Sequence, residues 1–276
     1  MAVVTWGTAH ILAGTLGGRA CPVLKIDNHR AVICYVKMVG GNQVAYACVV
    51  DVDPTTGNFT TYAEAEFCAD TTAIGDALWA CLLSSTSFYV GYSNNADGDT
   101  VYGRVGNISG TTITFGAETR TLNFSSRYQK CAALDSTHVL VAAEREDFPN
   151  EGKGDARVVE VSGDMIINLG GQVQFQTDRW TPWGLYPYII SLTSSTAIIS
   201  YVDMLGLSGK VYVYYLTIAG NTITLESNAL WDADESENLK GIRLTNSRFL
   251  SMWYDIANTQ EEICVGTAPT TQGPIS

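Results

Sequence analysis

The sequence predicts an all-β protein, specifically a five-bladed β-propeller of four-stranded blades in which residues 3–12 complete the fifth blade. Three observations predict this fold. A strand–turn–strand pattern occurs five times, a second pattern recurs in phase with it, and one repeat is divided between the two ends of the chain. We expect a single domain over residues 1–276, with residues 266–276 as a flexible tail.

The first pattern is an apolar strand, a short polar turn and a second apolar strand. The apolar residue before each turn is Ile26, Leu83, Leu134, Leu192 or Leu244, with spacings of 57, 51, 58 and 52 residues. The turns are built from Asp, Asn, Ser and Thr, and no helical periodicity intervenes. A repeat of about 55 residues with this composition is typical of one propeller blade.

The second pattern follows a glycine and occurs at residues 57–60, 110–116, 163–170 and 220–225, which is four times rather than five. Its fifth copy is at the start of the chain, in residues 3–12. The equivalent apolar positions are Trp6, Phe59, Phe115, Leu169 and Leu225, with spacings of 53, 56, 54 and 56.

The spacing counted from Leu225 to residue 276 and on from residue 1 to Trp6 is 57 residues, close to the other four, so the repeat continues from the end of the chain to its start. This wrap predicts that the first strand pairs with the last hairpin, near Ile263, which would remove the open edges of the sheet. An open solenoid is the alternative, but it calls for end caps and does not account for a divided repeat.

Composition excludes several classes of function. Sixteen Lys and Arg against 28 Asp and Glu give a net charge of −12, which argues against a nucleic-acid partner. No stretch approaches the roughly 20 apolar residues of a membrane-spanning helix, and the first residues lack the pattern of a secretion signal. We therefore expect neither membrane insertion nor export by a leader.

Cysteine and histidine usage predicts no metal site and no cofactor. The seven cysteines are an odd set without CxxC spacing, and most lie in apolar alternating segments where cysteine acts as a small hydrophobic residue. The three histidines are isolated from one another and from cysteine pairs. We expect buried free thiols.

The loops that vary most join the fourth strand of one blade to the first of the next, and the second strand to the third. Among them, residues 179–186 carry the densest chemistry, with the candidate ligand-binding residues Arg179, Trp180, Trp183 and Tyr186. Aromatic rings beside an arginine suit stacking on sugar rings and hydrogen bonding to them. The alternative is that both tryptophans fill the gaps between blades.

Weaker candidates for the same surface lie on two other loops. They are Trp231, Asp232 and Asp234 in one loop, and Arg127 and Tyr128 in another, with Trp79 nearby. The acidic residues 232–237 contain oxygen ligands suited to calcium, but a solvated acidic loop is the simpler interpretation.

A glycosidase would use Glu144, Asp203 and Asp255, which we expect at equivalent ends of second strands, where the other two blades carry Lys37 and Asn94. Residues in one layer of a repeat match for structural reasons, so we expect no catalytic residues and a protein that is not an enzyme.

Residues 108–116 and 134–141 resemble repeats of virion proteins of tailed bacteriophages, especially fibre and appendage components. The blade count is also similar to that of tachylectin-type lectins and five-bladed glycosidases. The phage resemblance implies a structural protein of the virion, assembled in the host cytoplasm. Its partners would be host-surface carbohydrate or other virion proteins. A soluble lectin and a glycoside hydrolase are the alternatives.

Overall fold

The computed structural model describes residues 21–71, 78–126, 128–147, 152–176, 187–203, 209–232, 236–255 and 259–268. The predicted all-β class is confirmed. In this part of the chain the elements are twenty-two strands and one short 3-10 helix, η1 (Asn95–Asp97). The strands form five consecutive antiparallel sheets, here called sheets 1 to 5.

The strands of each sheet are consecutive in the chain. Sheet 1 contains β1 (Val23–Lys25), β2 (Arg30–Val39), β3 (Asn42–Val52), β4 (Phe59–Thr61) and β5 (Ala65–Cys68). Sheet 2 contains β6 (Leu78–Ser84), β7 (Ser87–Asn94), β8 (Thr100–Ser109), β9 (Thr112–Phe115) and β10 (Thr119–Ser125). Sheet 3 contains β11 (Gln129–Ala133), β12 (His138–Glu144), β13 (Gly154–Ser162), β14 (Met165–Leu169) and β15 (Val173–Gln176).

The last two sheets are simpler. Sheet 4 contains β16 (Tyr188–Thr193), β17 (Thr196–Asp203), β18 (Lys210–Ala219) and β19 (Thr222–Asp232). Sheet 5 contains β20 (Ser236–Arg243), β21 (Arg248–Asp255) and β22 (Gln260–Thr267).

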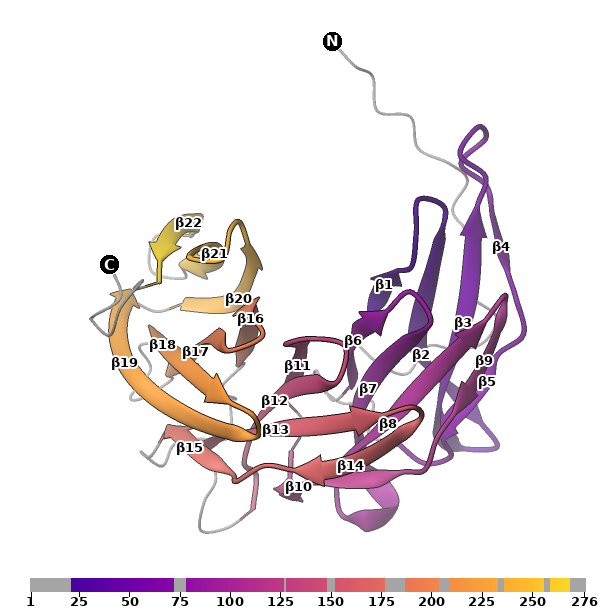
Figure 1. Ribbon diagram of the computed structural model, residues 1–276, viewed down its shortest axis with the longest axis horizontal. Helices are drawn as coiled ribbons and strands as arrows, with labels where there is room; N and C mark the ends of the chain where they lie inside the picture. Colours follow the sequence, from indigo (N-terminus) through magenta and orange to yellow (C-terminus); the bar gives the residue numbers. More distant parts are fainter. Residues whose placement is uncertain are drawn as a thin grey trace.

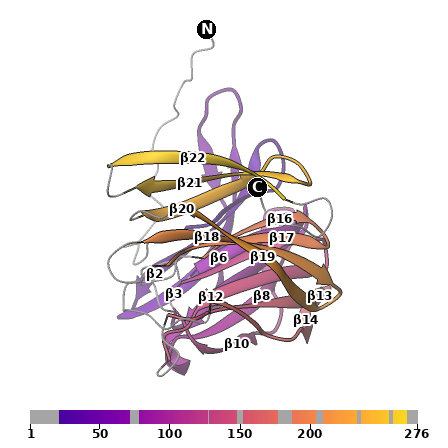
Figure 2. The same cartoon turned by 90° about the vertical axis from the view of Figure 1, so that its left-hand side faces the viewer.

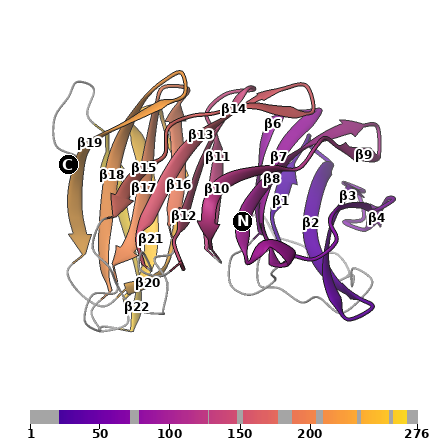
Figure 3. The same cartoon turned by 90° about the horizontal axis from the view of Figure 1, so that it is seen from below.

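The five sheets follow one another along an arc, which gives a propeller-like arrangement (Figure 1). The first strand of each sheet lies toward the middle of the arc, and β4, β9, β14 and β19 lie on its outside. Neighbouring first strands are in contact, as β1 is with β6, β6 with β11, β11 with β16 and β16 with β20. Figures 2 and 3 show the sheets stacked side by side like blades.

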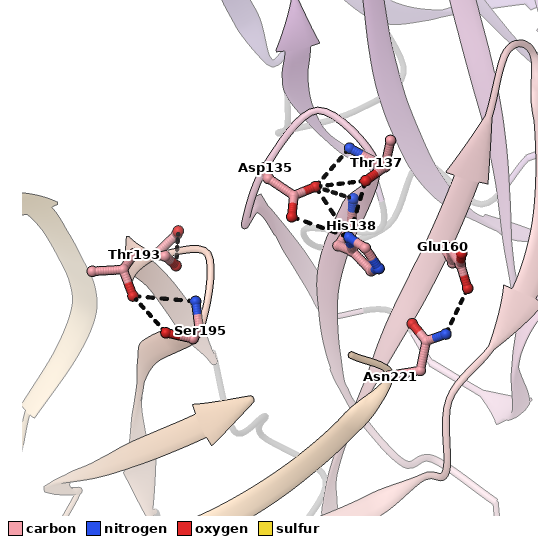
Figure 4. A network of polar contacts seen from close by, with 8 residues as sticks. Asp135, Thr137, His138, Glu160, Thr193, Ser195 and Asn221 are labelled. Carbon is pink, nitrogen blue, oxygen red and sulfur yellow. Dashed lines mark hydrogen bonds and ion pairs between the residues drawn. The ribbon is translucent and has the colours of Figure 1, made fainter. Parts of the chain in front are cut away.

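Each inner hairpin closes with the same local contact. The residue after the apolar position accepts a hydrogen bond from the backbone N–H two residues on, as Asp135 Oδ1 does from Thr137 and Thr193 Oγ1 from Ser195, at 2.7 and 3.1 Å (Figure 4). Asp27, Ser84 and Thr245 do the same in the other three sheets. Short Asp, Ser and Thr side chains favour such turns, which explains the recurring sequence pattern.

Alternating side chains build the core between the sheets. On β12, Leu140 and Ala142 pack toward sheet 4, whereas Val139, Val141 and Ala143 pack toward sheet 2. The same division holds at the junctions of sheets 1 and 2 and of sheets 4 and 5. One face of each sheet therefore packs on the opposite face of the next sheet.

The predicted fourth strand is interrupted in the first three sheets, where two short strands pair with the third strand. The break in sheet 2 falls at Gly116, and that in sheet 3 at Gly170. A Cβ atom at Gly116 would lie 1.6 Å from the backbone oxygen of Asp164, and one at Gly170 would lie 2.0 Å from that of Asn221. The breaks thus lie where the outer turn of the next sheet abuts the strand.

Closure of the ring lies beyond what the described residues show. Sheet 5 has three strands, and β22 has no partner on its outer side among the described residues. Residues 3–12, the predicted fourth strand, lie outside the described part of the chain. In Figure 1 sheets 1 and 5 occupy opposite ends of the arc.

The predicted tail is shorter than residues 266–276. Gly266 and Thr267 belong to β22, and the buried Ala268 donates a backbone hydrogen bond to Ser247 over 2.7 Å. Gly266 also lies against the rings of Phe249 and Trp231, where a side chain would not fit, so this part of the predicted tail is packed against the sheets. Residues 269–276 lie outside the described part.

Candidate functional site

Buried polar side chains gather at one end of the sheets, here called the polar end. The second strands of sheets 2 to 5 finish there, at Asn94, Glu144, Asp203 and Asp255. Most of the buried polar residues lie within two residues of this end, namely Thr71, Ser93, Thr100, Ser126, Gln129, Lys130, Glu144, Asp155, Gln176 and Asp255. The predicted variable loops leave the sheets at the same end, as expected for a rigid scaffold that presents a binding surface.

A lysine and two aromatic rings connect three inner strands at the polar end. The ammonium of Lys130 on β11 lies 4.1 Å from the centroid of the Trp79 ring on β6. The Trp79 ring in turn meets the ring of Tyr188 on β16 edge-on, with centroids 6.4 Å apart. Lys130 is 6% exposed, so much of its ammonium is desolvated and its attraction to the ring is strengthened.

A row of polar side chains crosses sheet 3 beside this cluster. Strand register places Glu144 opposite Gly154, and Gly154 opposite Gln176. The backbone N–H of Glu144 donates to the carbonyl of Tyr128 over 3.1 Å, which adds Tyr128 to the row. Across the junction with sheet 4, the hydroxyl of Tyr201 donates to Gln176 Oε1 over 3.3 Å. The junction of sheets 3 and 4 therefore contains buried amide, carboxylate and phenol groups near the polar end.

Asp155, on the adjacent strand β13, is engaged in an ion pair. Its Oδ2 lies 2.7 Å from Nε of Arg145, whose guanidinium stacks on Phe124 at 4.8 Å from the ring centroid. Burial raises the pKa of Asp155, while contacts from Gln172 and Arg145 act in the opposite direction. A carboxylate paired in this way supports the loop structure rather than chemistry on a substrate.

The densest predicted site lies outside the described residues. Arg179, Trp180, Trp183 and Tyr186 fall in residues 177–186, and Arg127 and Asp234 are also outside. The two ends of residues 177–186 are described, however. Gln176 ends β15 in sheet 3, and Pro187 precedes β16 in sheet 4. The loop therefore leaves and re-enters the structure at the polar end, next to the row that contains Tyr128.

Trp231 has a packing role between sheets 4 and 5. Its ring stacks on Phe249 with centroids 5.1 Å apart and planes 8° apart, and the Trp253 ring is 6.2 Å away. Trp231 thus fills a gap between two sheets, a role that the sequence analysis considered only for Trp180 and Trp183. Asp232 is the last residue of β19, opposite Val211. Its role as a ligand residue stays a prediction.

Glu144 and Asp255, two of the three carboxylates considered for catalysis, do not lie in equivalent positions of their sheets. Glu144 shares its face of sheet 3 with Ala142 and Leu140, which pack toward sheet 4. Asp255 shares its face of sheet 5 with Trp253 and Phe249, which also pack toward sheet 4, but from the opposite side. Glu144 lies ten residues after Leu134, the apolar residue before its turn, whereas Asp255 lies eleven residues after the equivalent Leu244. Because side chains alternate between the two faces of a strand, this difference of one residue places the two carboxylates on opposite faces of their sheets.

Sequence reasoning missed Lys130 and Gln176. A lysine at the start of an otherwise apolar inner strand, Gln129-Lys130-Cys131-Ala132-Ala133, is the signal that could have identified the first. Gln176 carries no comparable signal because its importance comes from Tyr201, on another sheet. Over the described ranges, no three His, Cys, Asp or Glu side chains gather as a metal ion would require. Nor does any described helix have the length and apolar character to cross a membrane.

All seven cysteines are free thiols. Cys34, Cys48, Cys68 and Cys131 are buried, Cys81 and Cys264 are half-buried, and Cys21 is exposed. The expectation of buried free thiols is thus confirmed for four of the seven.

Comparisons with known proteins add a distant likeness only. No protein-family model matches the chain, and the search of curated proteins found no match. Among solved structures, Pyrococcus horikoshii acylaminoacyl peptidase gives a TM-score of 0.49 at 9% identity, covering 92% of this chain and 38% of the peptidase. The chain therefore spans well under half of that protein.

Two further structures are similar at the same level. A neuraminidase-like protein of a flat-faced bat isolate gives a TM-score of 0.46 at 12% identity, covering 91% of this chain and 73% of that one. The β-propeller domain of the Trilobed protease from Pyrococcus furiosus gives a TM-score of 0.39 at 7% identity, covering 92% of this chain and 81% of that domain. These values are too low for any of the three proteins to inform the function of this chain.

Proposed function

We propose that the chain is a closed five-bladed propeller that acts as a non-enzymatic binding scaffold for carbohydrate on a host surface. The observation that carries the proposal is the polar end of the junction between sheets 3 and 4. There Lys130, Gln176 and Tyr201 lie at the base of the aromatic loop 177–186.

The chemistry of this junction suits a neutral or acidic sugar. Sugars are bound by aromatic faces together with a few fixed amide, hydroxyl and charged groups. The described residues supply the fixed polar groups, and the sequence of residues 179–186, which follows Gln176 and precedes Pro187 at the same end, contains two tryptophans, a tyrosine and an arginine. The loop has a proline at residue 182, and Pro187 follows it, which lowers the conformational entropy that binding would cost.

The hydrolase alternative is less well supported. Glycoside hydrolysis uses two carboxyl groups about 5 to 10 Å apart on either side of one bond. Glu144 and Asp255 lie at different junctions, and Asp155 is paired with Arg145. This arrangement favours binding without catalysis.

The place of the protein in a virion rests on the resemblance of residues 108–116 and 134–141 to phage appendage repeats. Another virion protein is the alternative partner for the polar end. A multivalent soluble lectin is the other alternative, and it would repeat its site in several blades. The Lys130–Trp79–Tyr188 cluster joins three different sheets, which favours one site per chain.

A glycan array probed with the full chain tests the proposal. We expect binding to a restricted set of glycans, at least tenfold weaker in Trp183→Ala and in Gln176→Ala. The control Ile167→Ala, on the exposed strand β14, should bind as the wild type does. Titration calorimetry with the best glycan should give one site per chain, whereas several equal sites would indicate the lectin alternative. No glycan bound by the wild type, or full binding by both site variants, would overturn the proposal.

A further inference from the structure

Two of the free cysteines lie on neighbouring inner strands. Cys81 is on β6 of sheet 2, and Cys131 is on β11 of sheet 3. The two strands are in contact and lie side by side near the middle of the arc (Figure 1). Lys130, which directly precedes Cys131, covers the ring of Trp79, which is two residues before Cys81. The two cysteines are therefore at nearly the same level of the two strands.

Their side chains are directed toward each other. Cys81 is two residues before Leu83, whereas Cys131 is three residues before Leu134, the equivalent position of the next repeat. Because alternate residues of a strand face opposite sides, this difference turns the Cys81 thiol toward sheet 3 and the Cys131 thiol toward sheet 2. Both side chains belong to the apolar core between these two sheets, where the thiols are in hydrogen-bonding contact.

A second pair of cysteines in adjacent strands lacks this geometry. Cys34 lies opposite Ala47 on β3, and Cys48 lies opposite Ile33 on β2. Cys34 packs toward sheet 2, whereas Cys48 is on the other face of sheet 1. A disulfide requires Cβ atoms about 4 Å apart and side chains that point toward each other. Among these four thiols, only those of Cys81 and Cys131 meet that requirement.

The two thiols differ in their access to solvent. Cys81 is half-buried, whereas Cys131 is buried. Burial and the neighbouring Cys81 thiol raise the pKa of Cys131, while the Lys130 ammonium acts in the opposite direction. Because the thiolate is the reactive form, Cys81 should react first with an external reagent and Cys131 second.

We infer that Cys81 and Cys131 form a disulfide between sheets 2 and 3 by exchange with a disulfide oxidant such as oxidised glutathione. The Cys81 thiol gives up its proton, and its sulfur attacks the oxidant, which releases one glutathione thiol and leaves a mixed disulfide. The Cys131 sulfur then gives up its proton and attacks the Cys81 sulfur, which releases the second glutathione thiol. The protein loses two S–H bonds and gains one S–S bond, and the oxidant is reduced by the same two electrons.

The disulfide links inner strands that are far apart in the chain. Cys81 and Cys131 are fifty positions apart, so a bond between them restricts the unfolded chain and stabilises the folded one. It also fixes β6 and β11 beside Trp79 and Lys130, which form the cluster at the polar end. Oxidation thus strengthens the scaffold at the strands that carry this cluster.

Peptide mapping of the folded chain tests the inference. Cys21, which is exposed, is replaced by Ser in every sample so that it does not crosslink chains. The reduced protein is incubated with oxidised glutathione at pH 8, alkylated in denaturant and digested without reductant. Mass spectrometry should show a peptide pair joined through Cys81 and Cys131 as the main disulfide, with Cys34 and Cys48 alkylated. A different main pairing, a lasting mixed disulfide at Cys81 with Cys131 free, or no reaction at either cysteine would overturn the inference.

Stability measurements test the consequence of the bond. The oxidised protein should have a urea midpoint about 1 M higher than the reduced protein. Cys131→Ser should show no such rise after the same treatment, whereas the matched control Cys34→Ser should show the full rise. Equal midpoints of the oxidised and reduced proteins would contradict the stabilising role, and the mapping gives the pairing even where a Ser variant does not fold. None of these readouts involves glycan, so the disulfide and sugar binding fail separately.

Discussion

Asn221, in the outer turn of sheet 4, donates a hydrogen bond from Nδ2 to Oε2 of Glu160 on β13 of sheet 3, over 2.7 Å (Figure 4). The same carboxylate oxygen accepts a second bond from Asn168 over 3.2 Å. The side chain of Glu160 thus links β14, the outer strand of its own sheet, to sheet 4. Such contacts hold the sheets at a fixed angle, which the loops at the polar end require.

The Glu160 contact predicts a pH-dependent stability. Hydrogen bonds from Asn221 and then Asn168 lower the pKa of Glu160. The contribution is present above the ordinary glutamate pKa of about 4.3 and is lost as the pH falls through the lower folded value. Asn221→Ala should therefore reduce the urea midpoint at pH 7, with a smaller difference from the wild type at about pH 3. An equal difference at both pH values would contradict this assignment.

Asp135 should stabilise the inner turn of sheet 3. Its Oδ1 accepts backbone hydrogen bonds from Thr137 and His138, at 2.7 and 2.8 Å. Asp135→Ala should cost about 1–2 kcal/mol of unfolding free energy at pH 7. Asp135→Thr should cost less than half of that, because Thr193 and Thr245 serve the same turn in sheets 4 and 5. Chemical denaturation of the three proteins measures both effects.

Two adjacent glycines should respond differently to the same substitution. A Cβ at Gly170 would meet the backbone oxygen of Asn221 at 2.0 Å, whereas one at Gly171 would meet nothing within 4 Å. Gly170→Ala should therefore destabilise the protein by about 2–3 kcal/mol, and Gly171→Ala should change the stability by less than about 0.5 kcal/mol. Thermal unfolding of both variants would reveal whether this contact between sheets exists, since similar melting temperatures would contradict it.

Trp231 should matter for stability rather than for binding. Trp231→Ala removes a half-buried ring that stacks on Phe249, and should cost about 2–3 kcal/mol. Trp231→Phe should retain roughly half of that stabilisation, because a smaller ring can still stack. Both variants should bind glycan as the wild type does once folded. A loss of binding without a loss of stability would instead support the ligand role predicted for this residue.

Thiol labelling should follow burial. Cys21 is exposed, whereas burial raises the pKa of Cys68 to about 11 and that of Cys34 and Cys131 strongly as well. At pH 8 an alkylating reagent should modify Cys21 first and the four buried cysteines only on unfolding, because the thiolate is the reactive form. Mass spectrometry of peptides at successive times gives the order, and early labelling of Cys131 would contradict the packing of sheets 2 and 3.

Much of the strand pattern in this fold was readable from the sequence. The turns predicted after Ile26, Leu83, Leu134, Leu192 and Leu244 each join the first two strands of a separate sheet. These features depend on neighbours in the chain, namely alternation and the turn chemistry of Asp, Ser and Thr. The interruption at Gly116 and Gly170 was not predicted, because it arises from the turn of the following sheet.

The candidate site was less accessible to prediction. The chemistry of Arg179, Trp180, Trp183 and Tyr186 was visible, and so was the end of the sheets from which their loop departs. The contribution of Lys130 was not, because its contact is with a ring on another sheet. The faces of Glu144 and Asp255 also required coordinates, since a difference of one residue in strand length reverses the direction of a side chain.

The order of strands and turns is thus a property of the sequence alone, because hydrogen bonds within a hairpin and the alternation of apolar residues act over a few positions. Only the tertiary structure decided that Trp231 fills a gap between sheets and that Lys130, Trp79 and Tyr188 meet. Lys130, Trp79 and Tyr188 are more than fifty positions apart in the chain, whereas Trp231 is nearer in sequence to its partners in sheet 5. The packing of whole sheets, and not any local preference, brings them together.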